Sequence, residues 1–345
     1  MKIKTRLNYL LKDENALYYE CSFSCDNAIF VSLENENFFI TDSRYVSEAK
    51  EFTKNTVVID GGRDLIKSTK ELIINSKIKS LTIDPLEWNI DAYKKLSEID
   101  LTFNKELNFS QKKRMIKSDA EIKTLKKAVE LGEYAFYKFS QYLQSEGVGK
   151  SEKYLNFILK NILQDMGELD LSFNPIVAID ENSAKPHALP SSKELNKNSL
   201  ILVDAGVKYN RYCSDRTRTS NMSLSIDFLQ TQNFTDKGKQ RIYDTVLKAH
   251  DKAIEAVRVG VKASDIDKAA REVIDKAGFA KEFLHSTGHG VGLDIHELPI
   301  ISKTSDTIIE ENMVFTIEPG IYLENSFGVR IEDMIVVQDG RAEVV

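Results

Sequence analysis

Four of the five histidines lie in two short segments rich in glycine and proline, NSAKPHALP and HSTGHGVGLDIHELP. The first segment contains His187, and the second contains His285, His289 and His296. Glycines beside a histidine let the backbone approach a ligand or a metal closely. A single histidine is more often structural than functional, as we expect for His250 in its ordinary helical pattern, but this clustering favours a binding site.

Four acidic residues occur in apolar sequence that predicts β-strands. Asp204 follows SLILV, Asp215 follows YCS, Glu318 lies in FTIEPGIY, and Glu332 is embedded in GVRIEDMIVV. A hairpin with its turn at about residues 208–211 would bring Asp204 and Asp215 together. Any one of the 53 acids is most simply a surface carboxylate. Buried carboxylates in strands, however, are costly unless they are paired or bound to a metal.

The four carboxylates have a shared electrostatic consequence. If they converge, they repel one another and raise one another's pKa values. Two divalent cations would cancel about four negative charges, so the group predicts a metallated site. Oxygen ligands with one imidazole suit manganese, cobalt, iron(II) or zinc, and the residue types leave these four open.

Two other motifs fail on spacing. GVGKS at residues 147–151 resembles the end of a phosphate-binding P-loop, but Gln144 stands where that loop needs a glycine, and the sequence before it predicts a helix. His296 and Glu297 begin an HExxH zinc motif whose second histidine is absent. We interpret GVGKS as a linker between helices and discard the zinc motif.

The elements that must carry these residues fall into two parts. Residues 1–112 alternate strand-like runs such as AIFVSL, NFFITD and SLTIDP with helical runs such as VSEAKEF, which predicts an α/β domain. After a charged stretch, Ser118 and Glu121 form the capping box of a new helix. We therefore place the domain boundary near residue 112 and expect a second domain over residues 113–345.

The second domain contains a weak internal repeat. Its first helix carries apolar residues at helical spacing, and Gly132 on the same face would let a neighbouring element approach closely. Two helices closed by glycines occupy residues 119–167, and the pattern recurs over residues 238–278, each time before strand-like sequence. The repeat predicts two related α+β halves.

Composition restricts the possible functions of the 345-residue chain. Hydrophobic residues at 42% and charged residues at 29% are typical of a globular protein and exclude a disordered one. A net charge of -6 gives no field that would attract nucleic acid or an anionic membrane. No signal-like stretch or long apolar run is present, so we expect a cytoplasmic protein. Cys21, Cys25 and Cys213 suit reduced, structural thiols.

Six segments in chain order resemble the signature of the pita-bread metallopeptidases, which include Xaa-Pro aminopeptidases, prolidases and methionine aminopeptidases. They are SFNPIVAIDENSAKPHALP, LVDAG, YCSDRTRT, HSTGHGVGLDIHELP, FTIEPGIY and GVRIED, and the resemblance covers about residues 112–345. SDRTRT, GVRIED and an N-terminal domain containing TDSRY favour the proline-peptidase branch. The resemblance implies an α+β protein: an N-terminal α/β domain with a mixed sheet, then a pita-bread domain of the creatinase and aminopeptidase type whose duplicated halves enclose metals.

The resemblance also implies a role for each candidate residue. Asp204 would bind one metal ion, His289 and Glu318 the other, and Asp215 and Glu332 both. Creatinase shares the fold but lacks this ligand set. A water bridging the two ions would attack the peptide carbonyl, with Glu318 as proton acceptor and donor. The remaining site residues are His187 and His296, which would bind the substrate and stabilise the tetrahedral intermediate, and His285 and Arg330, which would line the substrate site.

The main functional hypothesis is a dinuclear-metal Xaa-Pro aminopeptidase, which releases the N-terminal residue of a peptide with proline in second position. Manganese is the expected metal, with cobalt, zinc or iron as alternatives. A prolidase restricted to Xaa-Pro dipeptides is the alternative, and a non-catalytic pita-bread binding module is a third reading that the intact ligand set disfavours. The resemblance implies a homodimer, and we expect no nucleic-acid or membrane partner.

Several segments depart from the family pattern. Asp180 and Arg211 stand where glycines are usual, YYECSF replaces a YLTGF-like segment, and NMSLSIDFLQTQNFTDKG is longer than the usual turn. None of these positions is a predicted ligand. We therefore expect them to affect loop geometry and substrate preference more than hydrolysis.

Overall fold

Successive residues of the N-terminal strands pack into two different cores, because a strand points neighbouring side chains to opposite faces of its sheet. In the computed structural model, which describes residues 7–34 and 36–345, Tyr9 and Leu11 belong to one core and Leu10 belongs to the other. Phe30 and Ile29 divide in the same way. The sheet is therefore covered on both faces, which explains its nearly continuous apolar strands.

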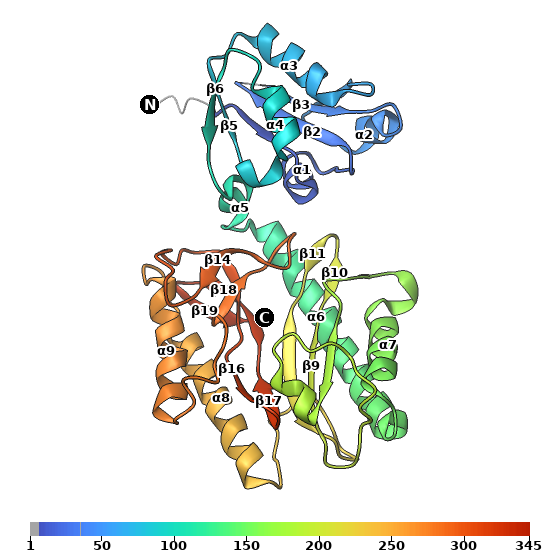
Figure 1. Cartoon of the computed structure of the whole chain (residues 1–345), viewed down its shortest axis with the longest axis vertical. Coiled ribbons are helices and arrows are strands. Elements are labelled where there is room, and N and C mark those ends of the chain that lie inside the picture. The colour runs from blue at the N-terminus through green and yellow to red at the C-terminus, as the bar shows by residue number, and fades with distance from the viewer. Residues whose placement is uncertain (1–6, 35) are drawn as a thin grey trace. The chain divides into compact units, whose positions relative to one another are not determined.

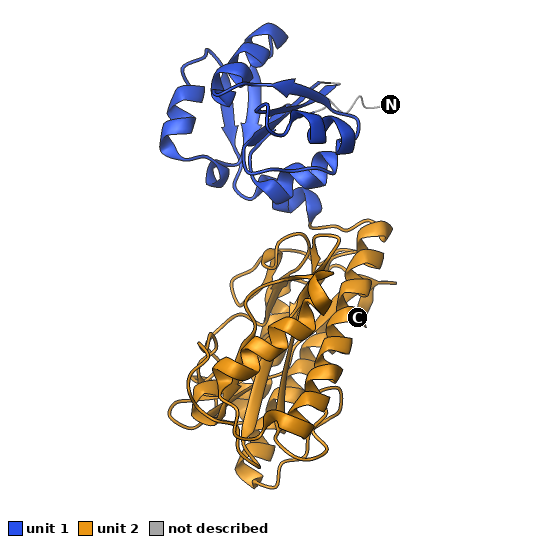
Figure 2. Ribbon diagram, turned by 90° about the vertical axis from the view of Figure 1, so that its right-hand side faces the viewer, with its two compact units in different colours: residues 1–114 blue, residues 115–345 orange. Residues whose placement is uncertain are grey.

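The first of two units spans residues 1–114 (Figure 2). Its elements are β1 (Tyr9–Leu11), α1 (Glu14–Cys21), β2 (Ala28–Leu33), β3 (Glu36–Thr41), α2 (Val46–Phe52), β4 (Val57–Asp60), α3 (Leu65–Ser76), β5 (Ser80–Ile83), α4 (Ile90–Leu96), β6 (Thr102–Lys105) and α5 (Phe109–Arg114). The strands form one sheet in the order β4-β3-β2-β1-β5-β6. Pairs β1-β2 and β2-β3 are antiparallel and the others are parallel, so the predicted mixed sheet is confirmed.

The second unit spans residues 115–345. Its elements are α6 (Asp119–Tyr142), α7 (Glu152–Leu163), β7 (Asp170–Leu171), β8 (Ile176–Ile179), β9 (Leu200–Ala205), β10 (Val207–Tyr209), β11 (Tyr212–Cys213), β12 (Arg216–Asn221), α8 (Lys237–Ala256), α9 (Ala263–Lys276), β13 (Gly288–Gly290), β14 (Glu297–Ile301), β15 (Val314–Ile317), β16 (Gly320–Leu323), β17 (Phe327–Arg330), β18 (Asp333–Gln338) and β19 (Arg341–Val344). Its described sheets have the strand orders β11-β10-β7, β12-β9-β8, β14-β13-β15-β18-β19 and β16-β17.

Helix α6 begins at the predicted capping box. The Ser118 side chain accepts a hydrogen bond from the backbone N–H of Glu121, and the Glu121 carboxylate accepts one from the Ser118 backbone at 2.8 Å. The close approach expected at Gly132 is also present, because a Cβ there would lie 3.2 Å from Ser214 Oγ. Helix α6 therefore packs directly against the residue that precedes Asp215.

Each half of the second unit has a helix pair, a sheet and a core of its own (Figure 1). Helices α6 and α7 contact β10 and β8, and their core includes Phe136, Leu159 and Val203. Helices α8 and α9 contact β15 and β14, and their core includes Val246 and Ile335. The predicted α+β class is confirmed, and the two helix-and-sheet halves account for the weak repeat in the sequence.

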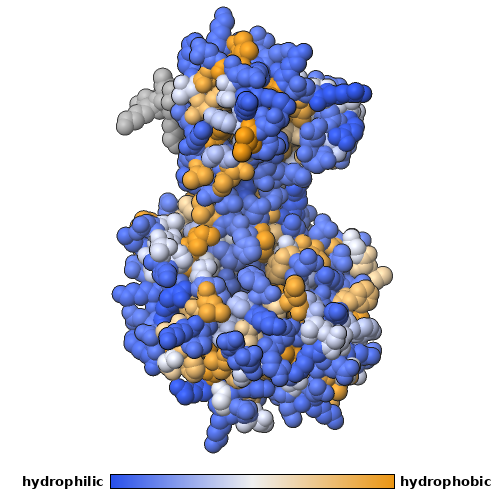
Figure 3. All heavy atoms as spheres, viewed as in Figure 1, coloured by the Kyte–Doolittle hydropathy of each residue, from blue (hydrophilic) through white to orange (hydrophobic). Residues whose placement is uncertain are grey.

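Polar residues dominate the visible face of the surface (Figure 3), and the three cysteines lie in the interior. In Figure 3, hydrophilic residues cover most of the visible face, and hydrophobic residues occur in small groups. Across residues 7–34 and 36–345, no helix is long and apolar enough to cross a membrane. All three cysteines are buried and free. Burial raises the pKa of Cys21 and of Cys213 to about 11, so both thiols stay protonated at neutral pH.

Candidate active site

A hairpin brings the first two acidic residues together, as the sequence predicts. Strands β9 and β12 are antiparallel, with Asp204 opposite Thr217, so Asp215 comes just before the start of β12. The chain between them turns at Asn210 and Arg211, which have φ angles of 47° and 70°. This left-handed backbone explains why glycine suits the position of Arg211.

The glycines beside His289 are required by the packing of its strand. Strand β13 pairs with β14 on one side and with β15 on the other. A Cβ on Gly288 would lie 1.8 Å from the Thr316 carbonyl oxygen, and one on Gly290 would lie 2.2 Å from the Leu298 carbonyl oxygen. Side chains at these two positions would therefore push the neighbouring chain away from His289.

Glu318 and Glu332 lie in breaks between strands. Glu318 follows β15, and its backbone N–H donates to the Thr287 carbonyl at 2.7 Å. Glu332 lies between β17 and β18, so the expectation that this carboxylate lies on a strand is wrong. Its backbone N–H donates instead to the Thr217 carbonyl at 3.0 Å, and Thr217 Oγ1 donates to its carboxylate at 2.6 Å. The break turns the Glu332 carboxylate towards the hairpin that carries Asp215.

All nine predicted site residues line one cavity of about 440 Å³. They are His187, Asp204, Asp215, His285, His289, His296, Glu318, Arg330 and Glu332. The other lining residues are Phe173, Asn174, Ile176, Pro186, Ser286, Ile295 and Ile300. The cavity thus combines a highly charged wall with apolar side chains, within the size range of small-ligand pockets.

His289 is oriented to bind a cation. Its Nδ1 lies 3.1 Å from the Gly290 carbonyl oxygen, a contact that requires the hydrogen on Nδ1 and leaves the Nε2 lone pair free. Nε2 lies 3.6 Å from Asp215 Oδ2 and 3.5 Å from Glu318 Oε1. Burial and the neighbouring His296 lower the pKa of His289 to about 3, so the ring is neutral. Three acceptor atoms therefore face one another, an arrangement that a metal ion would make favourable.

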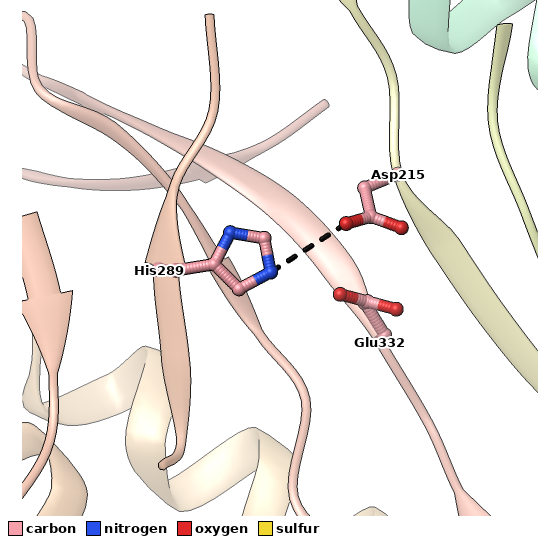
Figure 4. A group of neighbouring side chains, drawn as sticks. All are labelled: Asp215, His289 and Glu332. Carbon is pink, nitrogen blue, oxygen red and sulfur yellow. Dashed lines mark ion pairs between the residues drawn. The ribbon is translucent and has the colours of Figure 1, made fainter. Parts of the chain in front are cut away.

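The carboxylates also fit a metal centre. Ligand atoms of Asp215, His289 and Glu332 lie within 4.8 Å of one another (Figure 4). Burial, followed by the nearby carboxylates, raises the pKa of Asp215 and Glu318 well above their usual ranges, and raises the pKa of Glu332 to about 7. Among the described residues, buried Asp204 Oδ1 has no hydrogen-bond partner. This donor set fits divalent cations, which would neutralise the cluster and fill the missing contact.

A hydrogen-bonded chain connects Arg330 to His285 through Tyr322. Arg330 Nη1 donates to the Tyr322 hydroxyl at 2.8 Å, and this hydroxyl lies 2.7 Å from His285 Nε2. Burial raises the pKa of Tyr322 to about 12, whereas burial and then Arg330 lower the pKa of His285 to about 4. The protonated hydroxyl therefore donates to neutral His285. Tyr322 and Thr217 are site-supporting residues that the sequence analysis missed, although both lie in the quoted motifs FTIEPGIY and SDRTRT.

Two other predicted histidines face the same cavity. The His296 ring lies 4.3 Å from the His289 ring, edge to face, and burial lowers the pKa of His296.

His187 reaches the cavity from the other half of the unit, after a helical turn at Asp180–Ala184. Asp180 has a φ of 47°, and its carboxylate accepts a hydrogen bond from the Leu200 backbone at 2.9 Å. Its side chain thus offsets the strain of a left-handed position that suits glycine.

The sequence has clear relatives among known proteins. Residues 123–339 match the profile of Metallopeptidase family M24. An uncharacterised peptidase from Staphylococcus haemolyticus is 38% identical over 67% of this chain, and the match spans 62% of that peptidase's own length. A Xaa-Pro dipeptidase from Pyrococcus furiosus is 31% identical over 97% of this chain and 91% of that protein.

Solved structures resemble this chain over nearly its whole length. A Xaa-Pro dipeptidase from Bacillus anthracis has a TM-score of 0.88 at 32% identity, covering 98% of this chain and 92% of the other. An X-Pro aminopeptidase from Thermotoga maritima has a TM-score of 0.85 at 32% identity, covering 98% of this chain and 94% of the other. The two structures are equally similar in sequence but carry different activity names.

Proposed function

The chain belongs to metallopeptidase family M24, and we propose that it is a Xaa-Pro aminopeptidase, an exopeptidase that hydrolyses the bond between an N-terminal residue and a following proline. Family membership confirms the predicted pita-bread fold and a metal-dependent peptidase. The observation that carries the finer proposal is the group of four buried or half-buried carboxylates and a neutral histidine at one wall of the cavity.

We propose two divalent ions at this wall. Asp204 would hold one ion, His289 and Glu318 the other, and Asp215 and Glu332 both. The oxygen-rich donor set favours manganese, with cobalt, zinc or iron(II) as alternatives. When bound, the two ions would acidify a shared water and polarise the scissile carbonyl.

Glu318 would move the proton during hydrolysis. It lies beside His289, and its side chain is only 15% exposed, which limits competition from bulk water for the proton. The nitrogen of the scissile bond must gain a proton as the bond breaks, because it leaves as an amine. Glu318 would take a proton from the attacking water and deliver it to this nitrogen.

His296 and His187 would bind the substrate carbonyl and stabilise the tetrahedral intermediate. Burial keeps His296 neutral, so the ring retains one N–H to donate. The apolar side chains of Ile295, Ile300 and Phe173 line the same cavity and offer contacts for a proline ring. The proposed metal ligands and apolar side chains that suit a proline ring thus line the same cavity.

The hydrogen bonds that Arg330 already makes within the protein favour substrates longer than a dipeptide. A dipeptidase must bind the carboxylate of the proline itself, which calls for an available cation. Arg330 is the one arginine or lysine among the described lining residues, and each of its three nitrogens already donates to the protein. The second candidate, a prolidase, is favoured by the dipeptidase names of the Bacillus anthracis and Pyrococcus furiosus proteins. A binding module without catalysis is disfavoured because all five ligand positions are filled by ligand residues.

The remaining expectations stay proposals. We propose that the N-terminal domain ends near residue 112, that the protein acts in the cytoplasm as a homodimer, and that its partner is a peptide rather than nucleic acid or membrane. Light scattering coupled to gel filtration of the full chain tests the assembly. A monomer at micromolar concentration would contradict the dimer.

Three peptides separate the candidate functions. The full chain, loaded with manganese, is incubated with Ala-Pro, Ala-Pro-Ala and Met-Ala-Ser, and Glu318→Gln serves as the inactive control. Cleavage of Ala-Pro-Ala supports the aminopeptidase. Cleavage of Ala-Pro alone makes the protein a prolidase, and cleavage of Met-Ala-Ser overturns the proline-peptidase branch. Metal binding without any cleavage would reject the substrate class.

A further inference from the structure

We propose that Asp267 and Arg271 of α9 are positioning residues that fix the relative positions of His285, His289 and Glu318. The proposal rests on the proposed function, because it assigns to a distant pair the alignment of that same site. Neither residue lines the site cavity. Their influence must therefore pass through the chain segment that leads from α9 to His289.

The pair itself is rigid. Asp267 and Arg271 are one helical turn apart, and the Asp267 side chain is 0% exposed. Arg271 Nε donates to Asp267 Oδ2 at 2.7 Å, and Nη2 donates to Oδ1 at 3.1 Å. Two parallel bonds fix the plane of the guanidinium relative to the helix.

The pair holds the segment by its backbone. Asp267 Oδ1 accepts from the backbone N–H of Thr287 at 3.2 Å and from its hydroxyl at 2.9 Å. Arg271 Nη2 donates to the carbonyl of His285 at 2.5 Å, and the guanidinium lies 4.2 Å from the centre of the Phe283 ring. Residues 277–287 form no helix or strand, and the backbone N–H of Thr287 is shared between Asp267 Oδ1 and the Ile301 carbonyl, which lies at 2.9 Å. The bonds from Asp267 and Arg271 therefore add to the few backbone bonds that fix this segment.

The held segment controls three site side chains. His285 directs its ring at the Tyr322 hydroxyl. The Thr287 carbonyl accepts the backbone N–H of Glu318 at 2.7 Å, and His289 follows two residues later on β13. A shift of Thr287 would therefore move both Glu318 and His289, which we assign to the same metal ion.

The outer side of the pair is accessible. Arg271 is 29% exposed at its side chain and lines a separate cavity of about 570 Å³ together with Lys268, Phe283 and Lys303. A small cation in solution can therefore reach the position of the guanidinium when the arginine is shortened. This access allows a chemical rescue that a general loss of fold stability would not show.

The test uses the full-length, manganese-loaded protein with Ala-Pro-Ala as substrate. We expect Arg271→Ala to lower kcat by about 10–100-fold, the range seen when residues that orient metal ligands are lost, with a smaller change in KM. Millimolar guanidinium should restore part of this loss, whereas sodium at the same ionic strength should not. Asp267→Asn/Arg271→Ala should not be rescued, because the charge that holds the guanidinium is gone. Glu272→Gln, on the same helix but outside the Asp267–Arg271 pair, should leave kcat unchanged.

Two results would overturn the proposal: full kcat in Arg271→Ala, whether or not its Tm falls, or a loss of kcat that sodium restores as well as guanidinium does. If Arg271→Ala does not fold, Arg271→Lys takes its place, and it should lose kcat because an ammonium cannot span Asp267 and the His285 carbonyl. Calorimetry keeps this test separate from the substrate assignment. If the wild type cleaves no proline peptide, the proposed function fails. A roughly 10-fold weaker manganese affinity in Arg271→Ala would still support the positioning role of the Asp267–Arg271 pair, and an unchanged affinity would reject it.

Discussion

Arg330 Nη2 lies 2.6 Å from Asp204 Oδ2, while the other carboxylate oxygen of Asp204 is buried without a hydrogen-bond partner among the described residues. One oxygen of Asp204 is thus held by the protein and the other is available to a cation. This division of a single carboxylate suggests that Arg330 orients Asp204 as a ligand.

Arg330→Lys should weaken the binding of the metal ion assigned to Asp204 more than the binding of the other ion. A lysine keeps the charge but cannot reach Asp204, Thr217 and Tyr322 at once. In a calorimetric manganese titration, we expect the affinity of one binding step to fall by about 10–100-fold. The kcat should fall as well. Two unchanged binding steps would show that Arg330 does not orient the ligand.

Asp215→Asn and Glu332→Gln should each remove activity and metal together. Both residues are proposed to contact both ions, so each substitution withdraws one negative charge from two binding sites. Elemental analysis of protein purified without chelator measures the metal, and Ala-Pro-Ala hydrolysis measures the activity. Full activity in either variant would contradict the bridging assignment.

His296→Ala should separate catalysis from metal binding. Its ring packs against the ring of His289 but is assigned to the substrate. We expect kcat to fall by about 10²–10³, as for one lost donor to a transition state, while two metal equivalents remain bound. A parallel fall in metal content would make His296 a ligand instead.

Without metal, the contribution of Glu332 to stability should fall as the pH rises from about 4.5 to about 7. Burial and nearby carboxylates raise the pKa of Glu332 from 4.5 to about 7 in the folded state. Between these values the folded protein holds more protons at Glu332 than the unfolded chain, so this residue lowers the free energy of unfolding with increasing pH. His285 and His289, whose pKa values are lowered, act in the opposite direction, and Glu332 is isolated by comparison with a variant. Urea unfolding in chelator at pH 5 and pH 7.5 measures this change.

The matched variant for that experiment is Glu332→Gln, which cannot titrate and should show a smaller loss of stability between the two pH values. Saturating manganese should reverse the loss in the wild type, because a ligand at 100 times its Kd adds about 2.7 kcal/mol. Equal pH dependence in both proteins would mean that Glu332 does not carry the effect.

Arg211→Gly should stabilise the hairpin that carries Asp215. Arg211 has a φ of 70°, which costs a non-glycine residue about 1 kcal/mol. For a domain of this size, relief of that strain corresponds to an increase in Tm of about 2–4 °C, measured by calorimetry. Arg211→Ala is the control, since it removes the same side chain but keeps the strain. A gain in both variants would point to the arginine side chain instead of the backbone.

The sequence alone determined the residue types of the candidate site and the class of the fold. Histidines between glycines and carboxylates in apolar strands are local patterns, and Ser118 with Glu121 marks a helix start without any distant partner. The same local motifs predicted the family, since each needs only residues adjacent in the chain. The roles of His187, His296 and the five ligand residues remain predictions for the experiments above.

The tertiary structure decided which of these residues meet and what supports them. Glu332 contacts the Asp215 hairpin because both its backbone and its carboxylate bond to Thr217, a partner 115 residues away. Asp267, which holds Thr287, carries no local signal of function. Tyr322 lies in the motif FTIEPGIY, but its bond to Arg330 forms only in the folded chain. Side chains far apart in sequence converge only through strand pairing and packing, and burial then sets the pKa values that make a metal ion favourable.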